Sequence, residues 1–127
     1  MKRLLASLCA IALASVAAFA GEYPDISIAE LKKAIADKKV VVIDVNGTES
    51  YKEGHVATAL NFADIKGDLA SALPKDKDAL VVAYCGGPSC NAYTQAAAAA
   101  TKLGYTNVKH LSAGISGWTK ANEPTVK

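Results

Sequence analysis

Short apolar runs alternate along this chain with segments whose apolar residues recur at helical spacing. Residues 40–45 and 80–84 are almost continuously apolar, with no alternation of polar positions. Such runs are typical of strands that are buried on both faces of a sheet. Residues 59–62 and 107–111 are two further, shorter strand candidates.

The segments between these strands have helical patterns. Ser27 and Glu30 have the spacing of a capping box before an amphipathic segment. Thr48 is expected to cap a short helix that stops at Gly54. Further helices are predicted over residues 68–73, 92–103 (with Gly104 as a left-handed cap) and 115–121. Since strands and helices alternate, the sequence predicts an α/β fold with a mainly parallel sheet and helices on both faces.

The first 20 residues differ in composition from the rest. Two basic residues precede residues 4–20, which carry no charge, and small residues stand at Ala18 and Ala20. This order predicts a secretory signal peptide that is cleaved between Ala20 and Gly21 to give a periplasmic or secreted protein. The alternative is an uncleaved membrane anchor, for which an uncharged segment of 17 residues is at the lower limit of length.

Cleavage would leave residues 21–127, which carry 12 Lys, no Arg and 12 acidic residues, so that their net charge is zero. A neutral chain without a basic patch is a poor nucleic-acid binder, because phosphate contacts supply most of that affinity. No second stretch reaches membrane length, and we expect no membrane association after cleavage. The length predicts a single domain over residues 21–127.

Cys85 comes directly after the apolar run at residues 80–84. In open α/β sheets ligands bind beyond the carboxyl ends of the strands, which is where this cysteine is expected. The loop that follows leads into a predicted helix, and loop N–H groups together with the helix dipole favour a nucleophilic thiolate. The alternative is a buried, inert cysteine. The candidate loop consists of Gly86, Gly87, Pro88, Ser89, Cys90 and Asn91.

Cys90 is the second cysteine of the predicted mature chain. Its Cys-x4-Cys spacing with Cys85 differs from the Cys-x-x-Cys of thioredoxins. Three roles for Cys90 are compatible with the sequence. It is a resolving thiol that attacks a persulfide on Cys85, a disulfide partner of Cys85 in an oxidising compartment, or a loop residue without a chemical role. The sequence leaves these three alternatives open.

Five segments in series resemble the rhodanese-like family. Residues 42–45 resemble its first core strand, 51–61 its Tyr-x-x-Gly-His segment, 81–85 the strand that delivers the catalytic cysteine, and 103–108 and 111–118 its closing motifs. The resemblance extends over about residues 26–123. It implies a sulfurtransferase in which Cys85 accepts a sulfane sulfur as a persulfide. The implied donor is a small molecule such as thiosulfate or a persulfide, and the acceptor is a thiol or cyanide.

Two departures from the family pattern concern the donor. Thiosulfate-using members often carry a cation near the end of a six-residue loop, where this chain has Cys90, and Asn46 replaces a common arginine. We therefore expect weak activity with thiosulfate. The alternative function is a non-catalytic or redox module with a Cys85–Cys90 disulfide, acting in binding or thiol sensing. A phosphatase or arsenate reductase would need an arginine where Asn91 stands.

The remaining polar candidates are interpreted as structural. Asp44 in the buried strand is expected to accept hydrogen bonds, and His55 to pack as the family's Gly-His pair does. His55 and His110 with the two cysteines fit no usual zinc spacing, so the sequence predicts no metal site and no cofactor. It identifies no protein partner.

Overall fold

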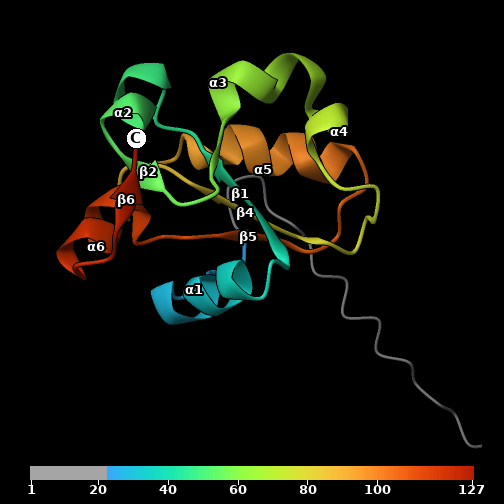
Figure 1. Cartoon of the computed structure of the whole chain (residues 1–127). Coiled ribbons are helices and arrows are strands. Elements are labelled where there is room, and N and C mark those ends of the chain that lie inside the picture. The colour runs from blue at the N-terminus through green and yellow to red at the C-terminus, as the bar shows by residue number, and fades with distance from the viewer. Residues whose placement is uncertain (1–22) are drawn as a thin grey trace, which may run out of the picture.

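The computed structural model describes residues 23–127, and the predicted signal peptide lies outside them. Its centre is a four-stranded sheet in the order β3-β1-β4-β5, and all neighbouring strands are parallel (Figure 1). The strands are β1 (Val40–Asp44), β3 (Leu60–Asn61), β4 (Leu80–Tyr84) and β5 (Val108–His110). The two strands predicted from the longest apolar runs, β1 and β4, are neighbours in the middle of the sheet.

Helices cover both faces of this sheet (Figure 1). One face packs against α1 (Ile28–Ala36) and α6 (Gly114–Lys120), and the other against α3 (Phe62–Ile65), α4 (Leu69–Ala72) and α5 (Tyr93–Lys102). The predicted α/β architecture with a parallel sheet is confirmed. Within residues 23–127, none of the helices has the length and apolar character that a membrane span requires.

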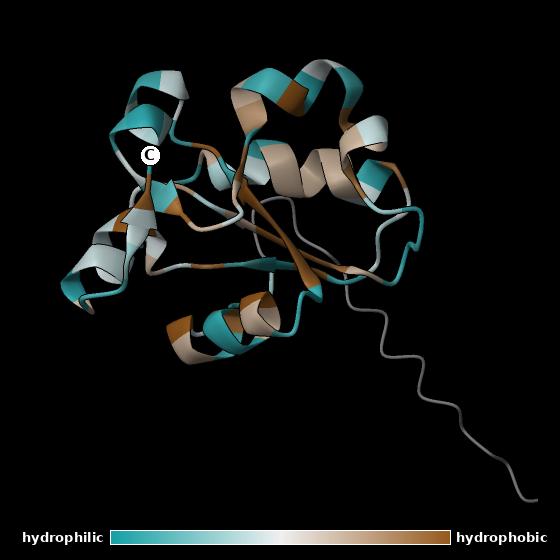
Figure 2. Ribbon diagram, viewed as in Figure 1, coloured by the Kyte–Doolittle hydropathy of each residue, from teal (hydrophilic) through white to brown (hydrophobic). Residues whose placement is uncertain are grey.

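The side chains of β4 divide between the two layers. Val81 and Ala83 belong to the core under α5, whereas Val82 and Tyr84 belong to the core under α1 and α6. Both cores are apolar, which is why the strand sequence shows no alternation of polar positions. Figure 2 shows the apolar colour concentrated in β1 and β4, while α2 (Thr48–Glu53) at the periphery is largely hydrophilic.

The predicted N-cap of α1 at Ser27 is present, but the Glu30 carboxylate binds the Ser27 hydroxyl and not the Ser27 backbone N–H of a full capping box. The backbone N–H of Glu30 donates to Ser27 Oγ at 3.1 Å, and the Ser27 hydroxyl donates to Glu30 Oε1 at 2.9 Å. At the other predicted cap, Gly104 follows α5 with a φ of +99°. These two helices therefore begin and end close to where their sequence signals predicted.

The predicted cap at Thr48 is wrong. Thr48 is the first residue of α2, and the cap position is Gly47, which has a φ of +89° and no side chain to donate or accept. The Thr48 hydroxyl instead accepts a hydrogen bond from Asn61 Nδ2 at 3.1 Å. The Thr48 hydroxyl oxygen is therefore bound by Asn61, which is distant in the sequence, and does not cap the helix locally. The helix predicted at 68–73 is also divided, into a 3₁₀ turn, η1 (Lys66–Asp68), and α4.

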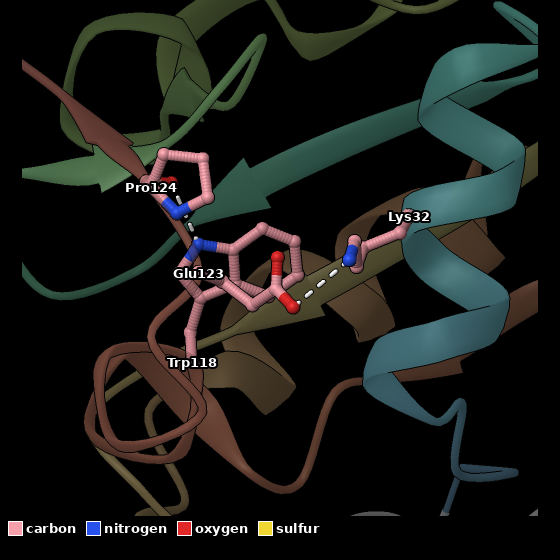
Figure 3. A network of polar contacts seen from close by, with 4 residues as sticks. All are labelled: Lys32, Trp118, Glu123 and Pro124. Atoms are coloured by element: carbon pink, nitrogen blue, oxygen red, sulfur yellow. Dashed lines mark hydrogen bonds and ion pairs between the residues drawn. The ribbon is translucent and has the colours of Figure 1, made fainter.

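Both ends of the described chain are joined to the body by pairings that the sequence pattern did not predict. A second, antiparallel sheet pairs β2 (His55–Val56) with β6 (Thr125–Val126). Two-residue strands are too short to show a period. Figure 3 shows the neighbouring contacts: Lys32 Nζ of α1 lies 2.9 Å from Glu123 Oε1, and Trp118 Nε1 donates to the Pro124 carbonyl at 2.9 Å.

Candidate active site

Cys85 is the residue immediately after β4, at the carboxyl edge of the sheet. Its side chain belongs to the core on the α5 side and is only 1 % exposed. This orientation follows from the alternation along β4, which sends Tyr84 to the opposite layer. The structure thus places Cys85 at the edge where ligands bind in open α/β sheets.

The loop after Cys85 is fixed by the start of α6. The N–H of Ile115 donates to the Cys85 carbonyl at 3.0 Å, and the N–H of Ser116 donates to the Gly86 carbonyl, also at 3.0 Å. Gly114 has a φ of +62° and lies against the Gly86–Gly87 peptide. The backbone position that demands glycine is therefore Gly114, whereas neither loop glycine has a positive φ.

The far end of the loop leads into α5. The Cys90 N–H donates to the Gly87 carbonyl at 3.1 Å, and the Thr94 N–H donates to the Asn91 carbonyl at 3.1 Å. Pro88 and Ser89 form the exposed tip between these bonds. The loop thus forms a tight turn that brings its last residues back toward Cys85.

Cys85 and Cys90 are joined by a disulfide, with their Cα atoms 6.3 Å apart. Of the three alternatives for Cys90, the structure contains the disulfide partner. Cys90 is half-buried and packs against the same core as Cys85. In this oxidised state neither sulfur is a thiolate, so nucleophilic chemistry at Cys85 requires reduction first.

A cavity of about 170 Å³ lies beside the segment that follows β1. It is bordered by Val45 and Gly47, and the intervening Asn46 directs its Oδ1 toward Gly86. Phe62, which shares the Cys85 core, forms another part of the wall. The full lining comprises Val45, Gly47, Phe62, Ala63, Lys66 and Gln95. The cavity holds a ligand of a few heavy atoms only.

One charged group at this cavity could not be identified from the sequence. Lys66 is the cation in its lining, and it is separated from Cys85 by 19 positions, so no local motif connects them. Asn46 Nδ2 is buried and has no hydrogen-bond partner among the described residues. A buried donor without a partner is unfavourable in the free protein.

The chain matches a known family of proteins. The family model described as "Rhodanese-like domain" matches residues 27–121. The chain belongs to the rhodanese-like family.

Among proteins similar to it is the uncharacterized protein YibN of Escherichia coli, with 29 % identity over 97 % of this chain and 86 % of that protein. A thiosulfate sulfurtransferase GlpE of Coxiella burnetii is 31 % identical over 81 % of this chain and 92 % of its own length. Among solved structures, the BH2092 protein of Bacillus halodurans has a TM-score of 0.70 and 35 % identity, covering 82 % of this chain and 77 % of that one.

Asp44 of this rhodanese-like chain is buried in a hydrogen-bond network between the two sheets. Tyr84 donates its hydroxyl to Asp44 Oδ2 at 2.6 Å and accepts from the Val56 N–H at 3.0 Å. Asp44 Oδ1 accepts from the Asn46 N–H at 2.8 Å. Burial and the bond to Asp44 raise the pKa of Tyr84 well above its usual value. Tyr84 is therefore a neutral core residue in the layer opposite to that of Cys85.

His55 is held in the same region by its own ring contacts. Its Nδ1 lies 2.7 Å from the Tyr51 carbonyl oxygen, and its ring is stacked on that of Tyr51 with centroids 3.6 Å apart. Burial, with the nearby carboxylates of Asp44 and Asp64, raises the pKa of Tyr51. Both residues assigned a structural role in the sequence, Asp44 and His55, make buried contacts away from Cys85.

His110 and Tyr93 form a second stack, on the Cys85 side of the sheet. Their ring centroids are 3.4 Å apart, and burial lowers the pKa of His110 although Asp25 acts in the opposite direction. Tyr93 belongs to the same core as Cys85. Within residues 23–127, no three or more His, Cys, Asp or Glu side chains are grouped so that they could hold a metal ion.

Proposed function

We propose that this rhodanese-like protein is a sulfurtransferase that uses Cys85 as its sulfur acceptor. The observation that carries the proposal is the position of Cys85, directly after β4 in a loop that leads into α5, within a chain matched by the family model. The thiolate attacks the outer sulfur of a donor such as thiosulfate, forming Cys85–S–S⁻ and releasing sulfite. A thiol or cyanide then takes the outer sulfur and regenerates the thiolate.

The electrostatics of the site bear on the donor. Thiosulfate is a dianion, and the predicted mature chain has no arginine to bind it with two hydrogen bonds. Lys66 lines the cavity beside Val45 and Gly47 and can act as a point charge there. We propose that donors with less charge on the sulfur, such as persulfides, react better than thiosulfate.

The test is sulfur uptake by reduced protein. The protein is treated with a thiol reductant, freed of it under exclusion of oxygen and incubated with a sulfane donor. Peptide mapping is expected to place the added sulfur on Cys85. Cys85→Ser should take up none, and full transfer by that variant would contradict the proposal. In Cys90→Ser the added sulfur should still map to Cys85.

A second candidate is favoured by the disulfide. In this alternative the Cys85–Cys90 pair stays oxidised, and the rhodanese-like fold serves in binding or thiol sensing. Thiol titration of the protein as isolated separates the two candidates, together with uptake after reduction. A protein that accepts no sulfane sulfur even when both thiols are free would fit this second candidate and exclude the first.

We further propose that residues 1–20 direct the chain out of the cytoplasm and are removed, leaving residues 21–127 as a single domain. Support comes from the basic start, the uncharged segment and the Ala-Phe-Ala ending. An exported protein meets oxidising conditions, in which a disulfide persists unless a reductant is supplied.

A further inference from the structure

We propose that Cys90 is a second catalytic cysteine, which attacks the Cys85 persulfide, releases hydrogen sulfide and leaves the disulfide seen in the structure. This inference rests on the proposed function. It adds an activity to it, because the protein would reduce sulfane sulfur to sulfide instead of only passing it to an external acceptor.

The geometry needed for this step is already built. The two sulfur atoms are bonded to each other, so the Cys90 sulfur reaches Cys85 within the folded loop. The bond from the Cys90 N–H to the Gly87 carbonyl fixes the turn that returns Cys90 toward Cys85. Both side chains pack against one core. An intramolecular thiol held at this position has a large kinetic advantage over a free thiol in solution.

The step balances in atoms and charge. The Cys90 thiol loses its proton and forms a bond to the inner sulfur, Cys85 Sγ, while the bond between the inner and outer sulfurs breaks. The outer sulfur leaves with the electron pair of that bond and takes up the proton, so the products are the disulfide and HS⁻. The Cys90 sulfur is oxidised from a thiol to a disulfide sulfur as the outer sulfur is reduced from a persulfide sulfur to sulfide, and Cys85 Sγ keeps its oxidation state.

Turnover then requires a reductant, and we assign this role to a dithiol. It exchanges its two hydrogens with the protein disulfide and becomes a cyclic disulfide itself. The two protein sulfurs differ in accessibility: Cys85 is almost completely buried, whereas Cys90 is half-buried. The dithiol is therefore expected to attack Cys90 first and to release Cys85 as the leaving thiolate, ready for the next donor.

The experiment is a single turnover without any external thiol. Fully reduced protein, freed of reductant under exclusion of oxygen, receives one equivalent of thiosulfate, which leaves sulfite and no thiol when its outer sulfur is transferred. Free sulfide and intact mass are measured over time. The wild type is expected to release about one equivalent of sulfide and to end as the disulfide. Cys90→Ser should keep the added sulfur on Cys85 and release at least about tenfold less sulfide.

The outcomes separate this inference from the function beneath it. If the wild type retains the added sulfur as Cys90→Ser does, Cys90 does not resolve the persulfide, although Cys85 is still a sulfur acceptor. Equal sulfide release by both proteins would overturn the inference in the same way. If neither protein takes up sulfur, the proposed function itself fails. Cys90→Ala repeats the comparison, in case a hydroxyl at this half-buried position disturbs the fold.

Discussion

Gly114 lies so close to Gly86 that a Cβ on Gly114 would stand 2.6 Å from the carbonyl carbon of Gly86. Its φ of +62° is also one that side chains other than that of glycine rarely adopt. The first residue of α6 is therefore fitted directly against the peptide that follows Cys85. A residue distant in the sequence thus helps to set the shape of the cysteine loop.

Gly114→Ala is expected to lower both stability and sulfur uptake. The added methyl group overlaps backbone that has no room to move, and the φ is unfavourable, which together should reduce the free energy of unfolding by more than about 2 kcal/mol. Gly47→Ala is the matched control, since Gly47 has a φ of +89° but no atom within 4 Å of the added Cβ. Urea unfolding of both variants checks the prediction, and equal losses would contradict it.

Tyr84→Phe is expected to destabilise the fold, although it removes no hydrogen bond of the cysteine loop. The change leaves Asp44 Oδ2 and the Val56 N–H without their buried partner, at a cost of about 1.5–3 kcal/mol. Tyr51→Phe serves as the control, because it removes a bond from a half-buried hydroxyl to the Ala59 carbonyl and should cost about 0.5–1.5 kcal/mol. Thermal or urea unfolding should rank the two in this order; the reverse ranking would argue against a role for Tyr84 in joining the sheets.

His110 should make stability depend on pH. Burial lowers its pKa below the usual 6.5, so the unfolded chain binds a proton at a pH where the folded protein does not. The free energy of unfolding that buried, neutral His110 contributes is fully present above pH 6.5. It is lost as the pH falls from 6.5 toward the pKa of His110 in the folded protein. His110→Phe keeps a ring against Tyr93 but does not titrate. Between about pH 7.5 and about pH 5.5 the wild type should lose more stability than this variant, and parallel curves would refute the assignment.

Cys90→Arg is expected to improve the use of thiosulfate. The change puts a cation at the loop position where thiosulfate-using members of the family often have one. A charge-assisted hydrogen bond is worth about 1.5–3 kcal/mol, which corresponds to a KM for thiosulfate lower by about ten- to a hundredfold. Cys90→Ser is the reference, because it also lacks the disulfide but adds no charge. Steady-state kinetics with cyanide as acceptor measure the difference, and identical KM values would show that charge does not limit donor binding.

The leader is tested by the N-terminus of the exported protein. Expression of the full chain in a bacterium should yield a protein in the periplasm or medium that begins at Gly21, because Ala18 and Ala20 provide the small residues before the cleavage site. Ala20→Arg should block cleavage. Recovery of the chain in the membrane fraction with Met1 still attached would favour the anchor instead.

The parts of the fold that could be predicted are those with a strong local signal. The runs that became β1 and β4 are apolar throughout, and the N-cap at Ser27 and the cap at Gly104 are local features of the chain. Thr48 failed as a cap because its hydroxyl binds Asn61, a partner that no local pattern reveals. The two-residue strands β2 and β6 were missed for a similar reason, since each exists only through its pairing with the other.

For the site, the sequence placed Cys85 correctly at a strand end but could not locate its surroundings. Asn46 and Gly114 are far from Cys85 in the sequence, and only the fold brings them against the cysteine loop. The relation between Cys85 and Cys90 also remained open, because five positions of separation are compatible with a bonded or an unbonded pair. The fold decides between them, because it brings the two sulfur atoms together in a disulfide.

The pairings at the two ends of the described chain limit when the protein can finish folding. The Ile26 N–H donates to the carbonyl of His110, and the Ser112 N–H donates to the Asp25 carboxylate 87 positions away. Strand β2 pairs only with β6, at residues 125 and 126. A ribosome or secretion channel that still holds the last few residues withholds that strand. Since chains emerge with the N-terminus first, the pairing of β2 with β6 forms only after release. Because this pairing forms last, β2 would stay unpaired while the chain passes through a secretion channel.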